Sequence, residues 1–273
     1  MLKRVVYLLA ATAYWLATLG CRRHRNGLVV LCYHNVSARQ VGGFAWQMRR
    51  VAGRTLALAD VRAPRPPGRG PWVFITFDDG FRNVLQHALP VLRACRLPAA
   101  LFVVSACLGR RAAWPSAGNP DRGERVVSAA ELCVAAREPL LHIGSHTRTH
   151  PRLDQVPFSV AVHELRGSRE ELEGLLHRPV LDVALPFGAY NSQTYSAARL
   201  AGYERVFTVD EQLWEPERGA GLIGRFQASP DLWRIEFLLT CAGAYAWLQP
   251  WRRFIRRVTE RLQRGPEPGR VPA

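Results

Sequence analysis

Short, mostly apolar runs recur along this chain, and polar residues, glycine or proline follow them. We predict a strand at each of the runs 28–33, 72–77, 99–105, 140–144, 180–185 and 205–209. Apolar runs of this length are typical of strands that are buried on both faces, as the strands of parallel sheets are.

Segments with helical signals lie between these runs. Helical periodicity predicts helices at 84–95, 158–176 and 195–202. Ser128 is the predicted N-cap of a further helix through 136, because Glu131 completes a capping box. Segments 65–71 and 110–125 are rich in Gly, Pro or polar residues and are predicted as loops. The alternation of strands and helices predicts an α/β fold with a parallel sheet.

Polar or glycine-containing positions follow several of the predicted strands. They are His34, Asp78-Asp79, His146 and Phe187-Gly188. In a barrel of parallel strands, chemistry is assembled at the carboxyl ends of the strands. These positions are therefore the first candidates for an active site.

Two motifs carry the strongest chemical signal. In Asp78-Asp79-Gly80, two adjacent carboxylates can converge at the exit of a strand, although within a strand they would point to opposite faces. His146 and His150 have the i, i+4 spacing with which two imidazoles bind one metal. One carboxylate and two imidazoles leave open positions on a divalent ion, which favours a hydrolytic site. The alternative is a plain turn and two solvated histidines.

Size, charge and cysteines narrow the class of protein. The 273 residues suit one large domain with short appendages. The formal net charge of +15 is nearly all arginine, which favours anionic lipid or an acidic glycan but also fits an ordinary solvated surface. No nucleic-acid-binding motif accompanies the arginines, so nucleic acid is not an expected partner. The six cysteines form no C-x-x-C pair and are predicted to be small buried hydrophobes.

Both ends of the chain differ from its middle. Residues 1–26 combine an apolar stretch with basic flanks, and the stretch is shorter than the about 20 residues of a spanning helix. We expect 1–26 to attach the protein to a membrane, as a signal anchor or as a helix in the membrane plane, with a helix packed on the domain as the alternative. Residues 241–263 are predicted as an aromatic and basic helix, and 264–273 as a disordered tail.

The segment 27–240 resembles the polysaccharide deacetylase family, whose members share the NodB homology domain. The resemblance rests on Thr76-Phe77-Asp78-Asp79-Gly80-Phe81, Ser145-His146-Thr147-Arg148-Thr149-His150-Pro151 and Leu185-Pro186-Phe187-Gly188. Tyr33-His34-Asn35-Val36 is similar to a Tyr-His-x-Val signature at the start of one branch. The resemblance implies a distorted, incomplete (β/α) barrel that hydrolyses N-acetyl groups on amino sugars. It also implies a divalent metal, Zn²⁺ in the first place, with Co²⁺, Ni²⁺ or Mn²⁺ as alternatives.

Carried over residue by residue, the resemblance makes Asp79, His146 and His150 the metal ligands and Asp78 the general base. The metal would lower the pKa of water and so make hydroxide available for attack on the amide. The backbone N–H of Phe187 is the implied donor to the oxyanion.

The chain departs from the family's commonest pattern in two places. No histidine follows His177, so the late motif that usually supplies the general acid is absent, and His34 is the candidate acid. The usual Arg ahead of the third motif is also absent, and Arg225 is the candidate for the positive charge beside Asp78.

Several of these assignments have structural alternatives. His34 can be a structural histidine at the end of a strand, and Phe187 can serve only in packing. Tyr190 and Pro186 are candidates for substrate contact, and Trp114 is a further candidate for a sugar subsite, although such aromatics are more often core or rim residues.

The sequence therefore predicts a metal-dependent hydrolase that removes N-acetyl groups from a cell-surface or lipid-linked polysaccharide, at the membrane of the cell envelope. One alternative is a deformylase or other N-deacylase of a lipid-linked sugar. Another is a catalytically lapsed carbohydrate-binding module of the same fold. The expected partners are the glycan and a membrane surface, and the sequence indicates no protein partner.

Overall fold

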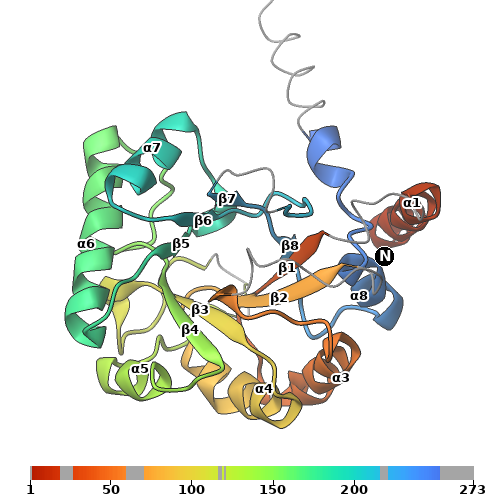
Figure 1. The fold of residues 1–273 in the computed structure, drawn as a ribbon, viewed down its shortest axis with the longest axis horizontal. Coiled ribbons are helices and arrows are strands. Elements are labelled where there is room, and N and C mark those ends of the chain that lie inside the picture. The colour runs from red at the N-terminus through yellow and green to blue at the C-terminus, as the bar shows by residue number, and fades with distance from the viewer. Residues whose placement is uncertain are drawn as a thin grey trace, which may run out of the picture.

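A curled sheet of eight parallel strands forms the centre of the protein, and helices cover its outer side (Figure 1). The computed structural model describes residues 2–18, 27–59, 71–115, 119, 121–215 and 221–252. The strands lie in the order β7-β6-β5-β4-β3-β2-β1-β8. Their bounds are β1 Leu28–Tyr33, β2 Trp72–Phe77, β3 Ala99–Val103, β4 Leu141–Ser145, β5 Asp182–Ala184, β6 Arg205–Phe207, β7 Leu222–Ile223 and β8 Phe226–Gln227.

The sheet is an incomplete barrel. All seven pairs of neighbouring strands are parallel. Strands β7 and β8 lie at the two edges, and no ladder joins them within the described part of the chain. The predicted α/β class and the incomplete (β/α) barrel are confirmed.

Helices follow most of the strands and surround the sheet (Figure 1). The α-helices are α1 Leu2–Thr18, α3 Val41–Val51, α4 Leu89–Cys95, α5 Ala129–Ala135, α6 Phe158–Leu176, α7 Ser192–Leu200 and α8 Arg234–Cys241. The shorter helical segments are Ala38–Gln40, Val84–Ala88, Ser105–Cys107 and Pro186–Gly188. Among the described residues, no helix is both long enough and apolar enough to cross a bilayer.

Most predicted elements are found, and the differences have local causes. The predicted bounds of α6 agree with the structure, and Ser128 caps α5 with Glu131 as expected. The segment 84–95 begins as a π-helix, because Pro90 lacks an N–H and its ring clashes with the carbonyl one turn back. Helix α7 begins earlier than predicted, since the side chain of Asn191 accepts a hydrogen bond from the Thr194 N–H.

Several elements were not predicted, and one predicted helix was wrong in part. Helix α3 was not predicted, and the two-residue strands β7 and β8 are too short to leave a pattern. Residues 242–247 form turns where the helix 241–263 was predicted, and Gly243 has a φ of 72° there. The loop 65–70, the basic cluster 22–25 and the segments 253–263 and 264–273 lie outside the described residues.

The core divides between the two faces of the sheet. On β2, Val73 and Ile75 belong to the larger cluster, which the helices cover, whereas Phe74 belongs to the smaller cluster inside the barrel. This alternation follows from the two-residue period of a strand. Thr76 and Asp78 have the same parity as Phe74, so they face the barrel interior and not the helices.

The turn after β2 requires a special backbone. Asp79 and Gly80 have φ values of 67° and 68°. A Cβ on Gly80 would lie 3.0 Å from Cγ1 of Val103 in β3. Glycine is therefore required by conformation and by space at this position.

The change Gly80→Ala should lower the free energy of unfolding by at least about 1 kcal/mol, through strain at positive φ and contact with Val103. Thermal and urea unfolding measure the effect. Gly174→Ala is the matched control, because Gly174 lies in α6 with nothing within 4 Å of an added Cβ. That change should stabilise by roughly 0.5–1 kcal/mol. Equal effects of the two changes would contradict the role given to Gly80.

Candidate active site

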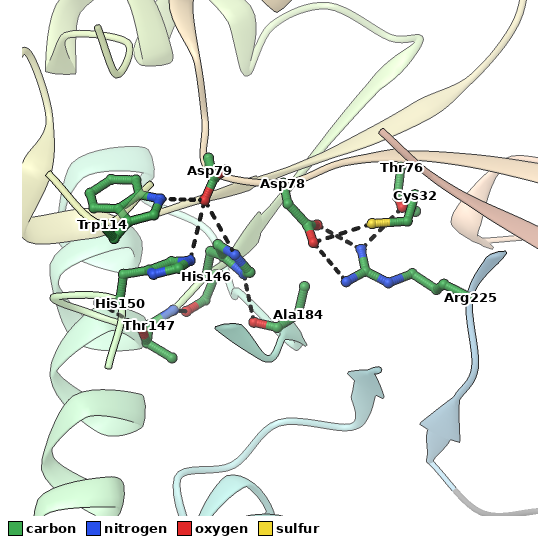
Figure 2. Close-up of polar contacts among 11 residues, drawn as sticks. Cys32, Thr76, Asp78, Asp79, Trp114, His146, Thr147, His150, Ala184 and Arg225 are labelled. Atoms are coloured by element: carbon green, nitrogen blue, oxygen red, sulfur yellow. Dashed lines mark hydrogen bonds and ion pairs between the residues drawn. The ribbon is translucent and has the colours of Figure 1, made fainter. Parts of the chain in front are cut away.

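The two adjacent carboxylates point to one end of the barrel through a change of backbone conformation. Asp78 continues β2 by one residue, since its N–H donates to the Tyr33 carbonyl at 2.9 Å. The positive φ of Asp79 then breaks the alternation of the strand. Both side chains lie side by side at the mouth of the barrel (Figure 2), and the two residues are only 3% and 4% exposed.

The two histidines stand on the loop after β4. His146 is fixed from behind, because its Nδ1 lies 2.8 Å from the Ala184 carbonyl in β5. His150 is held by its own N–H, which donates to Oγ1 of Thr147 at 3.1 Å. Thr147 and His150 both have a φ of 66°. The i, i+4 pair is therefore realised in a tight loop, and not on a helix.

A carboxylate from α6 supports this loop. Glu164 is 7% exposed and accepts hydrogen bonds from the N–H groups of Arg148 and Thr149, at 3.1 and 2.8 Å. It also accepts from the Thr149 hydroxyl at 2.7 Å. The sequence showed Glu164 only as one charge of an amphipathic helix, so its role in shaping the loop was missed.

Asp79, His146 and His150 form a cluster that fits a divalent metal. One potential ligand atom of each lies within 4.8 Å of the others. Oδ1 of Asp79 is 3.3 Å from Nε2 of His150 and 3.6 Å from Nε2 of His146. With ligand bonds of about 2.0–2.1 Å, tetrahedral geometry separates neighbouring donor atoms by about 3.3–3.4 Å. The spacing of the donor atoms therefore suits a cation between them.

The protonation states also suit a cation. Burial lowers the pKa of His146 to about 4, so its imidazole is neutral at neutral pH and keeps a lone pair. Burial alone would raise the pKa of Asp79, but its contacts with His150 and His146 lower that pKa below the ordinary value. The cluster thus offers an anionic carboxylate at Asp79 and a neutral imidazole at His146, which are the protonation states that metal binding needs.

Trp114 orients the carboxylate of Asp79. Its indole N–H donates to Oδ1 of Asp79 at 2.9 Å, and its ring stacks on the imidazole of His150 at 4.7 Å between centroids. The ring of Phe81 also stacks parallel to the indole of Trp114, with ring centroids 6.4 Å apart. Trp114, in the predicted loop 110–125, therefore contacts two of the candidate metal ligands directly, whereas the sequence indicated it only as a candidate for a sugar subsite.

Asp78 is kept apart from this cluster by Arg225. Two guanidinium nitrogens donate to the two oxygens of Asp78, at 2.6 and 2.7 Å (Figure 2). Burial would raise the pKa of Asp78, but the charge of Arg225 lowers it well below the usual range. Nε of Arg225 donates to the Thr208 carbonyl at 2.9 Å. Arg225 is fully buried. The structure places its guanidinium against Asp78, which is the position for which the sequence suggested it.

Cys32 of β1 and His34, which follows that strand, complete the surroundings of Asp78. Sγ of Cys32 lies 3.4 Å from Oδ2 of Asp78. His34 offers a ring nitrogen within 4.8 Å of the Cys32 and Asp78 ligand atoms. The sequence treated Cys32 only as a buried hydrophobe. The pairing of Cys32 with Thr76 across β1 and β2 is what brings the thiol to Asp78, and strand register is not visible in the sequence.

Asp78 with His34 and the cluster of Asp79, His146 and His150 line one hollow of about 330 Å³, which we call the central hollow. Its lining includes His34, Asp78, Asp79, Trp114, Asp121, His146, His150 and Phe187. The candidate base, the candidate acid and all three candidate metal ligands thus face one volume.

The remaining candidates differ in placement. Phe187 is 51% exposed, has a φ of 58° and contacts the His150 ring at 4.8 Å between centroids. It lies in the short segment Pro186–Gly188, where its own backbone is left-handed and the N–H of Gly188 donates to the Leu185 carbonyl at 2.9 Å. Tyr190 lines a neighbouring hollow and donates to Asp210 at 2.8 Å. Pro186 is buried and does not line the central hollow.

The change Trp114→Phe should weaken metal binding by about 10- to 100-fold, because Asp79 loses the donor that orients it while the ring stack is kept. Competition with a chelator measures the metal affinity. Trp46→Phe in α3 is the control for the loss of an indole elsewhere. An unchanged affinity in Trp114→Phe would show that the hydrogen bond does not support the cluster.

Comparisons with known sequences identify a protein family for this chain. The family model described as polysaccharide deacetylase matches residues 65–206, just over half of the chain. YxkH of Bacillus subtilis (strain 168) is 24% identical over 160 residues, which cover 59% of this chain and 52% of that protein. The poly-beta-1,6-N-acetyl-D-glucosamine N-deacetylase of Staphylococcus aureus (strain MSSA476) is 22% identical over 173 residues, covering 60% and 56%. The chain spans about half the length of the curated relatives it matches.

Solved structures show the same fold. IcaB from Ammonifex degensii has 27% sequence identity and a TM-score of 0.67, over 81% of this chain and 97% of that one. The Streptococcus pyogenes deacetylase PplD in complex with acetate has 20% identity and a TM-score of 0.65, over 80% and 99%. With the family model spanning the Asp-Asp-Gly turn and the histidine loop, these matches lead to one conclusion: the chain belongs to the polysaccharide deacetylase family.

Proposed function

We propose that this protein is a metal-dependent hydrolase that removes N-acetyl groups from amino sugars of a polysaccharide. The observation that carries the proposal is the separation of two adjacent carboxylates. Asp79 lies with His146 and His150, whereas Asp78 is bound by Arg225. One carboxylate can then ligate a cation while its neighbour stays available for proton transfer.

The residues of the chain divide the chemistry among them. Asp79, His146 and His150 would hold the cation, which supplies a Lewis acid for the amide carbonyl and acidity for the attacking water. Asp78, kept ionised and oriented by Arg225, receives the proton of that water. Because its pKa is low, Asp78 is a weak base and depends on the acidity that the cation provides.

The reaction also needs a hydrogen-bond donor to the oxyanion and a proton donor to the leaving amine. Phe187 lines the central hollow, and its N–H would donate to the oxyanion. His34 lines the same hollow and would give a proton to the nitrogen as the C–N bond breaks. The products are acetate and a free amine on the sugar.

The shape of the mouth supports a polymeric substrate. The central hollow shares Phe187 and Gly188 with a second hollow of about 700 Å³. It shares His34 and Asp121 with a third hollow of about 240 Å³. Three hollows in a row leave room for sugar units on both sides of the reacting one. The exposed ring of Phe187, between two of them, offers a flat face for a sugar ring.

The pair Asp78→Asn and Asp79→Asn tests the division of roles. Asp78→Asn should lower acetate release from N-acetylglucosamine oligomers by at least about 100-fold while bound metal is retained. Asp79→Asn should lose both activity and metal. Metal content of the purified protein and acetate release are the two measurements, and retained metal in Asp78→Asn shows that the site still folds.

Each other outcome of this experiment has a meaning. Acetate release that survives Asp78→Asn would refute Asp78 as the base. Release of formate from a lipid-linked sugar, without release of acetate, would favour a deformylase. Binding of oligomers without release of any acid would point to a lapsed carbohydrate-binding module.

The change His34→Gln should lower turnover of the oligomer by about 10²- to 10⁴-fold with metal content unchanged, because the leaving amine loses its proton donor. Hydrolysis of 4-nitrophenyl acetate should fall much less, since that leaving group needs no proton. His142→Gln is the control, because His142 bonds Asp182 on β5 and does not line the central hollow. An equal loss with both substrates would exclude His34 as the acid.

A further inference from the structure

Helix α1 is apolar on two opposite faces. Residues 2, 5, 6, 9, 13 and 16 recur at spacings of three and four and share one face of the helix. They are Leu, Val, Val, Leu, Ala and Leu. Residues 4, 8, 11 and 15 share the opposite face. A helix that is apolar all round is normally covered on both sides.

The inner face of α1 is covered by the domain itself. Ala11 is fully buried in a cluster with Leu239 of α8 and Ala244, and Leu8 and Trp15 pack against this cluster. Arg4 bonds Glu236 of α8, with its Nε 2.7 Å from Oε1. Figure 1 shows α1 lying beside α8 at the edge of the barrel.

These contacts argue against a spanning helix. With 17 residues, α1 is roughly 26 Å long at about 1.5 Å per residue. The hydrocarbon core of a bilayer is about 30 Å thick. Crossing it would also expose the inner face of α1 and break the pair of Arg4 with Glu236.

The outer face of α1 has no cover within the described part of the chain. Leu2, Val6, Leu9 and Leu16 are 80%, 54%, 65% and 57% exposed. The neighbouring helix α8 adds further exposed apolar side chains: Trp233, Ile235 and Leu238. We call these residues of α1 and α8 the apolar face. Exposed apolar side chains gathered on two neighbouring helices mark a site of interaction.

Pairs of arginine and tryptophan lie at α8 and at its neighbours α1 and α3. The guanidinium of Arg4 lies 4.3 Å from the centre of the Trp233 ring. Those of Arg50 and Arg234 lie 5.3 and 5.1 Å from the Trp46 ring. Arginine and tryptophan together are favoured at the boundary between lipid headgroups and acyl chains. The net charge of +15 adds attraction to anionic lipid.

We propose that the apolar face docks on the surface of an anionic lipid bilayer, with α1 lying in the membrane plane. The outer side chains of α1 enter the boundary of the acyl chains, while the inner side chains stay packed on α8. Arg50 and Arg234, beside Trp46, contact the headgroups, while Arg4 keeps its pair with Glu236. Lipid is the occupant that this combination of apolar side chains and cations fits.

Docking would hold the candidate active site close to the membrane. Gln227 of β8 lines both the central hollow and a hollow of about 220 Å³ beneath α1 and α8. The apolar face therefore adjoins the side of the barrel on which glycan would bind. This consequence rests on the proposed function, whereas the docking itself does not.

Flotation of the full chain with lipid vesicles tests the proposal. The protein should float with vesicles of phosphatidylcholine and phosphatidylglycerol, and less with phosphatidylcholine alone. Val6→Gln combined with Leu9→Gln should lower the vesicle partition coefficient by at least about tenfold. The matched control is Val134→Gln with Leu200→Gln, whose native side chains are 71% and 57% exposed on α5 and α7, away from the apolar face. This control should float like the unchanged protein.

Acetate release from a soluble oligomer should be the same in all three proteins, so failure of docking and failure of the proposed function are separate results. Equal flotation of the two double variants would overturn the proposal. So would an unchanged chain that does not float with either vesicle. A dimer that the Val6→Gln, Leu9→Gln variant dissociates, without vesicle binding, would assign the apolar face to a second copy of the chain.

Discussion

The buried ion pair between Asp78 and Arg225 is the constraint on which the candidate site depends. Arg225 is fully buried and Asp78 is only 3% exposed, so each charge needs the other, and removing one partner of such a pair typically costs about 3–5 kcal/mol. The guanidinium also bonds the Thr208 carbonyl and the Thr76 hydroxyl. The pair therefore ties the end of β2 to segments beyond β6 and β7, on the other side of the barrel mouth. It fixes the direction of Asp78 before any substrate arrives.

The same constraint explains how two neighbouring carboxylates can have different tasks. Left alone, both would compete for one cation or repel each other. Arg225 neutralises Asp78 on one side, while Trp114 and the two imidazoles surround Asp79 on the other. The left-handed backbone at Asp79 makes this division possible, because an extended residue there would point away from the barrel mouth. Strain in the turn is thus stored where the chemistry is assembled.

The surface of the protein has two contrasting sides that meet at β8. The row of hollows across the barrel mouth is lined by polar and aromatic side chains suited to a glycan. The outer side of α1 and α8 is apolar and bordered by arginine and tryptophan. The hollows and the apolar side together fit the proposed hydrolase that acts on a polymer near a lipid surface. The large positive charge of the chain is compatible with each of them.

The fold class, most strands and the residues of the Asp-Asp-Gly and His-x-x-x-His motifs could be predicted from the sequence, because buried parallel strands leave long apolar runs and the motifs are contiguous in the chain. The sequence also pointed to His34 and Arg225 as replacements for missing family residues. The partners of these residues become visible in the folded chain alone: Cys32 beside Asp78, Trp114 on Asp79 and Glu164 under the histidine loop. These contacts join residues from separate strands, helices and loops, and strand register and loop path carry no local signal. For the same reason, the sequence left open whether the apolar N-terminal helix packs on the domain, and the structure shows that its inner face does.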